Sequence, residues 1–437
     1  MKKSIKMLAL LMAVILAIGS FAACGSKKTD SGNQPEATQA PEATKAPEAT
    51  QAPAEATPVA LKVWAPENQI QTKTIDSMCK SFQALHPEWN ITFTVEAQGE
   101  DKAKDEILKD VASAADVYFF ANDQLTALVS AGAIARLGGS TEEMVKTTMA
   151  DAVVDTVTVD NAIYAIPFTH NTFFMYYDKS LLTAEDVKTV ETIMAKQTTE
   201  DVYNFCFSSA GGWKLGAWYY GADLTIYGES QTDFAAGANW NNPTGLAVTN
   251  YLIDLINNPK SAYEDDISIS ELAADHRLGA WFDGAWNYQT YKEALGDDLG
   301  LAVLPTFNPD GKSYQLKGFY GSKAIGVNPQ AANPEVAVAF AAYLGSEEMQ
   351  LQRFKETAQA PTNKNAGASA EVQADEVAAI LVKEVELASV MQPTAAEFGA
   401  RYWSNAGAIA TEIRNGELTK ENAQAKLDTF VANLAVE

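Results

Sequence analysis

The pattern of apolar and polar positions changes abruptly near residue 61. Upstream, a six-residue repeat of Pro, Glu, Ala, Thr, Gln or Lys, and Ala begins at Pro35, Pro41 and Pro47, and it has no large apolar side chain. Such a segment cannot bury enough surface to offset the entropy of ordering. We therefore predict a disordered, extended spacer over residues 24–60. Downstream, apolar residues recur with the periods of strands and helices, which predicts a folded region.

The segment from residue 61 to residue 132 alternates strand and helix patterns. Apolar runs predict strands at 61–64, 91–95 and 117–120, and helical spacing predicts helices at 75–85, 102–112 and 122–132. This order favours an open, mostly parallel sheet with helices on both sides. Ligands of such sheets lie beyond the carboxyl ends of the strands. Those ends supply residues 64–68, 99–100 and 120–123.

The rest of the chain predicts a second region of the same α/β class. Strand patterns cover residues 162–168, 172–177 and 299–304, whereas residues 184–300 and 334–437 look largely helical. The folded part, about 375 residues, exceeds one ordinary core, so we expect two lobes.

The first 23 residues have the pattern of an export signal. Lys2, Lys3 and Lys6 precede an apolar run, Met7 to Phe21, that is too short to span a bilayer comfortably. Small residues then precede Cys24, as in the bacterial lipobox, where the cysteine is lipidated. We therefore predict that Cys24 is lipidated and anchors the chain to the membrane. The alternative is an ordinary secretory signal with an incidental cysteine.

Composition narrows the classes of partner. Lys and Arg total 32 and Asp and Glu total 56, for a net charge of −24. So acidic a chain repels phosphate, which argues against binding of nucleic acids or anionic lipids. The three cysteines and three histidines are scattered, so we expect no cofactor and no metal site.

No catalytic motif is apparent. The sequence lacks a G-x-S-x-G elbow, a Walker loop and an H-E-x-x-H pair. Cys79 and Cys206 lie among apolar residues and are expected in the core. We expect a structural or hinge role for His170. Acidic pairs are plentiful, but the sequence does not show the carboxylate separation that a glycosidase needs.

Aromatic residues in turn-like contexts are the more informative feature. Several of the tryptophans and tyrosines stand beside glycine or in aromatic pairs, at 211–213, 218–221, 283–286, 319–321 and 401–403. Aromatic rings stack on the C–H faces of sugars, while carboxylates and amides bond to sugar hydroxyls. Together these chemistries suit a carbohydrate, although each tryptophan taken alone could equally be buried.

Four motifs, in this order, resemble the family of extracellular solute-binding proteins of sugar ABC transporters, in particular its maltose/maltodextrin-binding branch. They lie at residues 115–134, 164–182, 280–286 and 300–307. The resemblance covers Leu61 to about Val436. It implies a two-lobed periplasmic-binding-protein-like fold of type II, in which each lobe is a mostly parallel sheet flanked by helices. The expected boundaries are 61–169 plus 303–357 for the first lobe and 170–302 plus 358–437 for the second.

The resemblance also implies which residues bind the sugar. By position they are Glu67, Asn68, Phe120, Asp123, Asn171, Trp213, Trp286, Tyr402 and Trp403. Asn171 and Gln124 depart from the residues common in maltodextrin binders, where an acid and an arginine often stand. The implied ligand is an α-1,4-glucan oligosaccharide.

The implied mechanism is binding without chemistry. Sugar would sit between lobes joined by crossovers near 169–171, 299–306 and 357–361, and the closed, monomeric protein would dock on a membrane permease. Cys79 and Cys206 would lie in different lobes and form no disulfide. Three alternatives remain: another oligosaccharide as ligand, a secreted glycoside hydrolase with paired carboxylates, and a structural lipoprotein.

Overall fold

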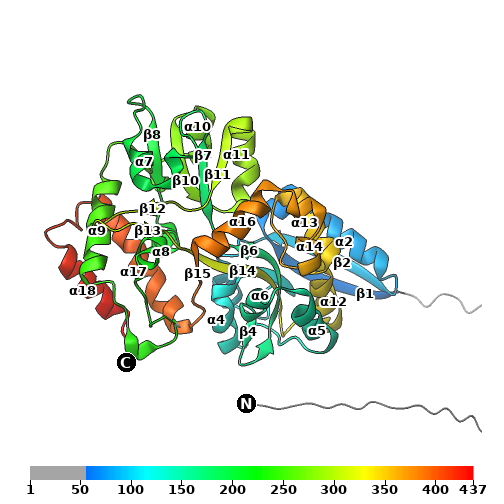
Figure 1. The fold of residues 1–437 in the computed structure, drawn as a ribbon. Coiled ribbons are helices and arrows are strands. Elements are labelled where there is room, and N and C mark those ends of the chain that lie inside the picture. Colours follow the sequence, from blue (N-terminus) through cyan, green and yellow to red (C-terminus); the bar gives the residue numbers. More distant parts are fainter. Residues whose placement is uncertain (1–55, 230, 437) are drawn as a thin grey trace, which may run out of the picture. The chain divides into compact units, whose positions relative to one another are not determined.

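The computed structural model describes residues 56–229 and 231–436 (Figure 1). The predicted export signal, Cys24 and nearly all of the predicted spacer lie outside these residues. The first strand, β1 (Thr57–Ala65), begins earlier than predicted, so residues 57–60 belong to the fold and not to the spacer. Within the described ranges, no helix is both long enough and apolar enough to cross a membrane.

The first sheet has six strands, in the order β15-β14-β3-β1-β2 with β6 also paired to β14. Strands β1, β2 and β3 are mutually parallel, and β14 runs antiparallel to β3 and β6. The bounds after β1 are β2 (Trp89–Ala97), β3 (Val117–Ala121), β6 (Ala165–Asn171), β14 (Gly318–Val327) and β15 (Ser389–Met391).

One continuous core lies under this sheet and its helices. The apolar stripe of α2 (Thr74–Leu85) packs against α12 (Pro334–Leu344), where the Phe82 and Phe340 rings meet edge to face at 5.1 Å. Cys79 belongs to this core, as predicted, and burial raises the pKa of its thiol to about 12. The helices of this half are α1 (Glu67–Gln71), α3 (Ala103–Ile107), α4 (Leu125–Ser130), α5 (Gly139–Thr148), α6 (Asp151–Asp155) and α13 (Glu347–Thr357), with a small hairpin of β4 (Thr158–Val159) and β5 (Ala162–Ile163).

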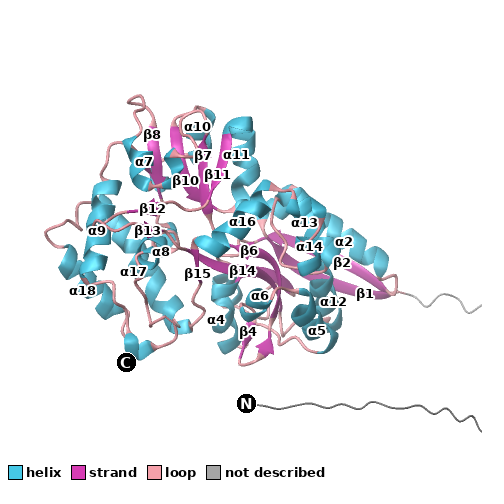
Figure 2. Cartoon of the chain, in the orientation of Figure 1, coloured by secondary structure: helices cyan, strands magenta, loops and turns pink. Residues whose placement is uncertain are grey.

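The second sheet has five strands, in the order β11-β7-β10-β8-β9, and only β7 runs against the others (Figure 2). Alternate side chains enter two cores on opposite faces: Phe205 and Phe207 enter one, and Cys206 enters the other. The strands are β7 (Phe174–Asp178), β8 (Tyr203–Phe207), β9 (Ser261–Tyr263), β10 (Leu278–Asp283) and β11 (Leu299–Ala302).

Helices and a small hairpin complete the second half. The hairpin joins β12 (Thr306–Phe307) to β13 (Tyr314–Gln315) and packs in a core of the second sheet. The helices are α7 (Val190–Ala195), α8 (Gly216–Gly221), α9 (Pro243–Ile256), α10 (Ile269–Ala274), α11 (Tyr288–Leu295), α14 (Lys364–Gly367), α15 (Ala370–Gln373), α16 (Glu376–Leu387), α17 (Ala396–Arg414) and α18 (Ala423–Asn433).

The chain passes between the sheets at several points. It leaves β6 for β7 through Thr172 and Phe173, and it returns from β11 to β14. The predicted crossover near 357–361 lies beside the first one, because Thr169 Oγ1 donates to the carbonyl of Ala360 at 2.8 Å. A further passage was not predicted: β15 joins the first sheet between α16 and α17.

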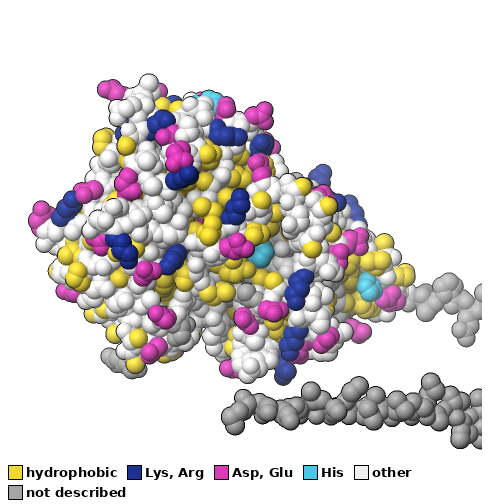
Figure 3. Space-filling model, in the orientation of Figure 1, with side chains coloured by type: hydrophobic (Ala, Val, Ile, Leu, Met, Phe, Trp, Pro, Cys, Tyr) yellow, Lys and Arg dark blue, Asp and Glu magenta, His cyan; other side chains and the backbone are white. Residues whose placement is uncertain are grey.

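The α/β class and the order of elements over 61–132 are confirmed. The prediction that 184–300 is largely helical is wrong, since β8, β9 and β10 lie within it. The helix predicted over 102–112 ends at Ile107. The lobe boundaries stay a prediction. On the surface, Figure 3 shows Lys and Arg interspersed with Asp and Glu, so the negative charge is not gathered on the face in view.

Candidate functional site

The carboxyl ends of four strands gather polar loops at one edge of the first sheet. Because β1, β2, β3 and β6 are parallel, their final residues share this edge. There α1 follows β1, the loop with Glu100 follows β2, and a 3₁₀ turn (Asn122–Gln124) follows β3. Gln124 Nε2 donates to the Glu100 carbonyl at 2.6 Å, which ties the second loop to the third.

The corresponding edge of the second sheet carries two tryptophans. Trp213 follows β8 through a 3₁₀ turn (Ala210–Gly212), and Trp286 lies in a 3₁₀ turn (Ala285–Asn287) after β10. Their rings are tilted by 37° with centroids 6.0 Å apart, and both side chains are half-buried. Two neighbouring indole faces are therefore presented at one edge.

Side-chain contacts join these two edges. Trp213 Nε1 donates to Gln392 Oε1 at 2.9 Å, and the Gln392 side chain is also hydrogen-bonded to Asp123. Lys323 Nζ lies over the Trp286 ring, 4.4 Å from its centroid, and 3.0 Å from Glu100 Oε2. The polar loops of the first sheet thus meet the aromatic loops of the second.

The backbone around Trp213 is held by α17. Gly211 and Gly212 have φ values of +61° and +98°, which favour glycine. A Cβ on Gly212 would lie 2.8 Å from that of Ala406, so the turn packs directly on α17. Tyr402 Oη donates to the Gly212 carbonyl at 2.9 Å, and Phe173 meets Trp213 edge to face.

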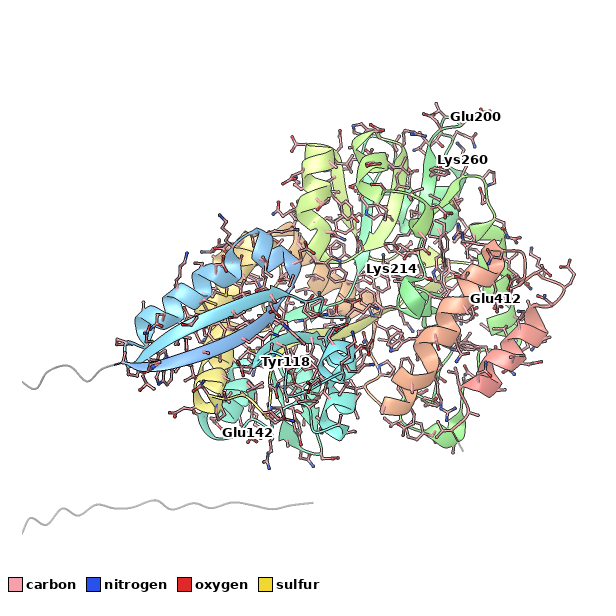
Figure 4. The ribbon with its side chains drawn as sticks, turned by 180° about the vertical axis from the view of Figure 1, so that it is seen from behind. Tyr118, Glu142, Glu200, Lys214, Lys260 and Glu412 are labelled. Carbon is pink, nitrogen blue, oxygen red and sulfur yellow. The ribbon has the colours of Figure 1, made fainter. Side chains whose placement is uncertain are left out.

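The position of Trp286 is set by a neighbouring glycine and a buried carboxylate. A Cβ on Gly284 would lie 2.1 Å from the six-membered ring of Trp286, so the ring fits against bare backbone. Asp283 accepts from Gly284 N and Asn287 Nδ2, each at 2.8 Å, which fixes the turn. Lys214, labelled in Figure 4, lies 4.0 Å from Asp283 and 3.2 Å from Glu264, and it compensates the buried charge.

Asp123 is the perturbed acid of the site. Desolvation raises its pKa from 3.8 to about 6, although its own backbone and Lys104 act in the other direction. A carboxylate removed from water retains strong hydrogen-bond acceptors for polar partners. Here one such partner is the Gln392 amide.

His170 lies at the crossover beside the site. Its Nδ1 is 3.1 Å from Tyr320 Oη, and the ring also donates to the carbonyl of Pro361. Burial lowers the pKa of His170 to about 4, so the ring is neutral near pH 7. Its contacts join two crossovers, which agrees with the structural role expected for it.

The remaining predicted site residues occupy different environments. Trp403 is half-buried and packs edge to face on Phe319 and Phe398. Asn171 is buried at the end of β6, opposite Gly321. Glu67 is exposed and accepts from Gln71, and Asn68 is half-buried in the same short helix.

Two predicted contacts have no exposed surface in this conformation. Phe120 points into the core of the first sheet, and Tyr402 lies beneath the Gly212 turn. Both support neighbouring loops and do not line a surface. Sequence reasoning missed Gln392 and Lys323 as site residues, because no motif marks either of them.

Comparison with known proteins places this geometry in context. A family model for bacterial extracellular solute-binding proteins matches residues 77–379. The maltodextrin-binding protein MdxE of Bacillus subtilis (strain 168) is 25% identical over 328 residues, which are 71% of this chain and 75% of that protein. A galactooligosaccharide-binding protein of the same organism is 23% identical, over 70% of this chain and 74% of its own length.

Solved structures of similar proteins have the same fold as this chain. One with acarbose is 41% identical, with a TM-score of 0.81, and covers 86% of this chain and 98% of its own. The maltodextrin-binding protein MalE1 from L. casei BL23, solved without ligand, is 26% identical with a TM-score of 0.75, over 86% of this chain and 99% of its own.

Proposed function

Because the chain belongs to the bacterial extracellular solute-binding protein family, we propose that it binds malto-oligosaccharides for a carbohydrate ABC importer. The ligand would lie between the loops of the two sheets and pass unaltered to the permease. The two lobes, with the boundaries predicted from the sequence, would close on it. Contact with both lobes favours the closed form through differential affinity.

One observation carries the proposal: the Trp213–Trp286 pair faces Asp123, Gln392 and Lys323 from the other sheet. The indole faces suit the C–H faces of a sugar, and the carboxylate and amide suit its hydroxyls. The similarity to maltodextrin binders supports α-1,4-linked glucose units. Within this site, Trp213, Trp286, Trp403 and Asp123 are the proposed direct contacts, with Glu67, Asn68 and Asn171 at the rim.

The rest of the predicted cellular role belongs to the same proposal. Lipidation of Cys24 would anchor a monomer to the outer face of a bacterial membrane, and residues 24–56 would space it from that surface. No catalytic step is required for binding and delivery. The galactooligosaccharide-binding relative favours a galacto-oligosaccharide as the second candidate ligand.

A calorimetric panel on the purified protein tests the ligand. We expect heat of binding with maltotriose and maltotetraose, and none with galacto- or xylo-oligosaccharides of equal length. Binding only to galacto-oligosaccharides would replace the ligand, and no binding to any sugar would reject the proposal. Thin-layer chromatography of the same mixtures tests the hydrolase alternative, which requires shortened products.

A further inference from the structure

Lys323 occupies an unusual place for a lysine, in the interior of a central strand. It lies on β14, and its side chain is 11% exposed. Its ammonium lies over the Trp286 ring and is paired with Glu100. Attraction between a cation and an indole face is strongest where water is excluded, as it is here.

The surroundings of Trp286 limit where a ligand can stack. Part of its ring lies against Gly284, where even a Cβ would overlap it. The Lys323 ammonium covers the ring as well. A sugar ring that stacks on the face under the ammonium must displace the lysine, because the two cannot occupy the same place. Gly284 is fixed backbone, whereas the lysine side chain is flexible, so the lysine is the group that can move.

We propose that Lys323 competes with the ligand for the face of Trp286 and thereby sets the affinity of ligands that stack on this indole. This inference rests on the proposed function, because it concerns the same site. Ligands whose rings stack well displace the ammonium, whereas small polar solutes do not. Lys323 therefore lowers the affinity for every ligand that must use this indole.

When the lysine is displaced, the negative charge of Glu100 is still balanced by a second cation. The buried guanidinium of Arg353 interacts electrostatically with Glu100 and lies over the Phe168 ring at 4.6 Å. A carboxylate between two cations keeps one of them when the other moves. Among the described residues, Glu100 Oε1 has no hydrogen-bond partner, so it is free to accept from the moved ammonium or from a ligand hydroxyl.

Calorimetry with maltotetraose on the full chain tests the competition. Lys323→Met keeps the length of the side chain and removes the charge, so we expect Kd to fall on the order of fivefold. Lys323→Arg keeps a cation over the ring, so its Kd should stay near that of the wild type. Lys355→Met is the matched control, because Lys355 pairs with Glu371 at an exposed position. An unchanged or weaker affinity of Lys323→Met, or an equal gain in Lys323→Arg, overturns the proposal.

A second readout needs no ligand. The fluorescence of Trp286 is the wild-type spectrum minus that of Trp286→Phe. When the same subtraction is made in the Lys323→Met background, we expect the difference spectrum to change. In the Lys355→Met background it should equal that of the wild type. An unchanged difference would reject the contact itself, whatever sugar the protein binds. Failure of every sugar to bind, with the fluorescence change present, would reject the proposed function and leave the ammonium–indole contact supported.

Discussion

Exposure separates the tryptophans that can stack on a ligand from those that build the cores. Trp218, Trp240 and Trp281 are fully buried, whereas Trp213 and Trp286 are half-buried at the edge of the second sheet. From the sequence alone, each of these tryptophans could equally be a core residue or a ligand contact. The two edge rings are also held differently: Trp213 by its hydrogen bond to Gln392, and Trp286 by its fit to Gly284.

Replacement of Trp286 by alanine removes a stacking face. We expect oligosaccharide affinity to weaken by about 1–3 kcal/mol, the scale known for stacking of bases on aromatic side chains. Calorimetry with maltotetraose measures it. Trp89→Ala is the control, since Trp89 begins β2, at the opposite end of the parallel strands, and stacks on His86. Equal affinities of wild type and Trp286→Ala would remove this ring from the site.

Asp123 makes stability depend on pH in a defined direction. Its folded pKa of about 6 exceeds its usual 3.8, so the folded state binds the proton more tightly. The contribution of Asp123 to the free energy of unfolding is therefore full below pH 4 and is lost as the pH rises to 6. His170, whose folded pKa is lowered to about 4, acts in the opposite direction over nearly the same range.

Subtraction of melting temperatures isolates the aspartate. Asp123→Asn lacks the titrating group and retains His170. We expect the melting temperature of the variant, minus that of the wild type, to rise between pH 4 and pH 6 and then level off. A difference that is flat with pH would mean that Asp123 is not desolvated in the folded protein.

At the scale of elements, a three-residue strand brings a decisive side chain to the site. β15 pairs with β14, and Gln392 N extends this pairing by donating to the Tyr320 carbonyl at 2.7 Å. The Gln392 side chain then links Trp213 to Asp123. The short apolar run of Val390 and Met391 has no periodicity that could predict this strand.

Gln392→Ala should weaken oligosaccharide binding by about 1–2 kcal/mol, the usual cost of lost hydrogen bonds, because it leaves the Trp213 indole and Asp123 without their link. Calorimetry measures the affinity, and the melting temperature reports on folding. Gln373→Ala, on exposed α15, is the control. An affinity within twofold of the wild type would show that the bridge does not organise the site.

Sequence pattern predicted the amphipathic helix α2 and the short buried strands β3 and β7, but it missed the buried strands β10 and β14. The helix expected at 75–85 is α2 almost to the residue, because its apolar residues recur on one face and its polar residues face water. Strand β10 is buried at every position, and such a run cannot be told from a helix by period. Strand β14 contains three glycines, two of which pack against Asn122 and Tyr118, so its sequence lacks a strand pattern.

At the scale of the whole molecule, the site combines segments that are far apart in the chain. Asp123 and Trp286 were predicted because motifs mark them, and Trp213 because it follows two glycines at 211–212 and falls near an aromatic of the resembled family. Lys323 and Gln392 reach the same place only because β14 and β15 join the first sheet. Their positions therefore depend on the crossovers between sheets, which local patterns do not specify.

The folded unit should be independent of the residues before it. Strand β1 starts at Thr57, whose N–H donates to the Glu88 carbonyl at 2.9 Å, and it lies between β2 and β3. A protein that begins at Ala56 should keep the melting temperature and sugar affinity of the full chain. One that begins at Val63 loses most of a central strand and should not fold. A large loss of stability in the first, or cooperative melting of the second, would contradict this.

The placement of the cysteines has a practical consequence. A version that begins at Ala56 retains only Cys79 and Cys206, each buried in a separate core. Burial raises the pKa of both thiols, so almost no reactive thiolate is present at neutral pH. A single cysteine introduced on the surface could then carry a fluorophore without mutation of the native thiols, which makes this protein a ready scaffold for an optical sugar sensor.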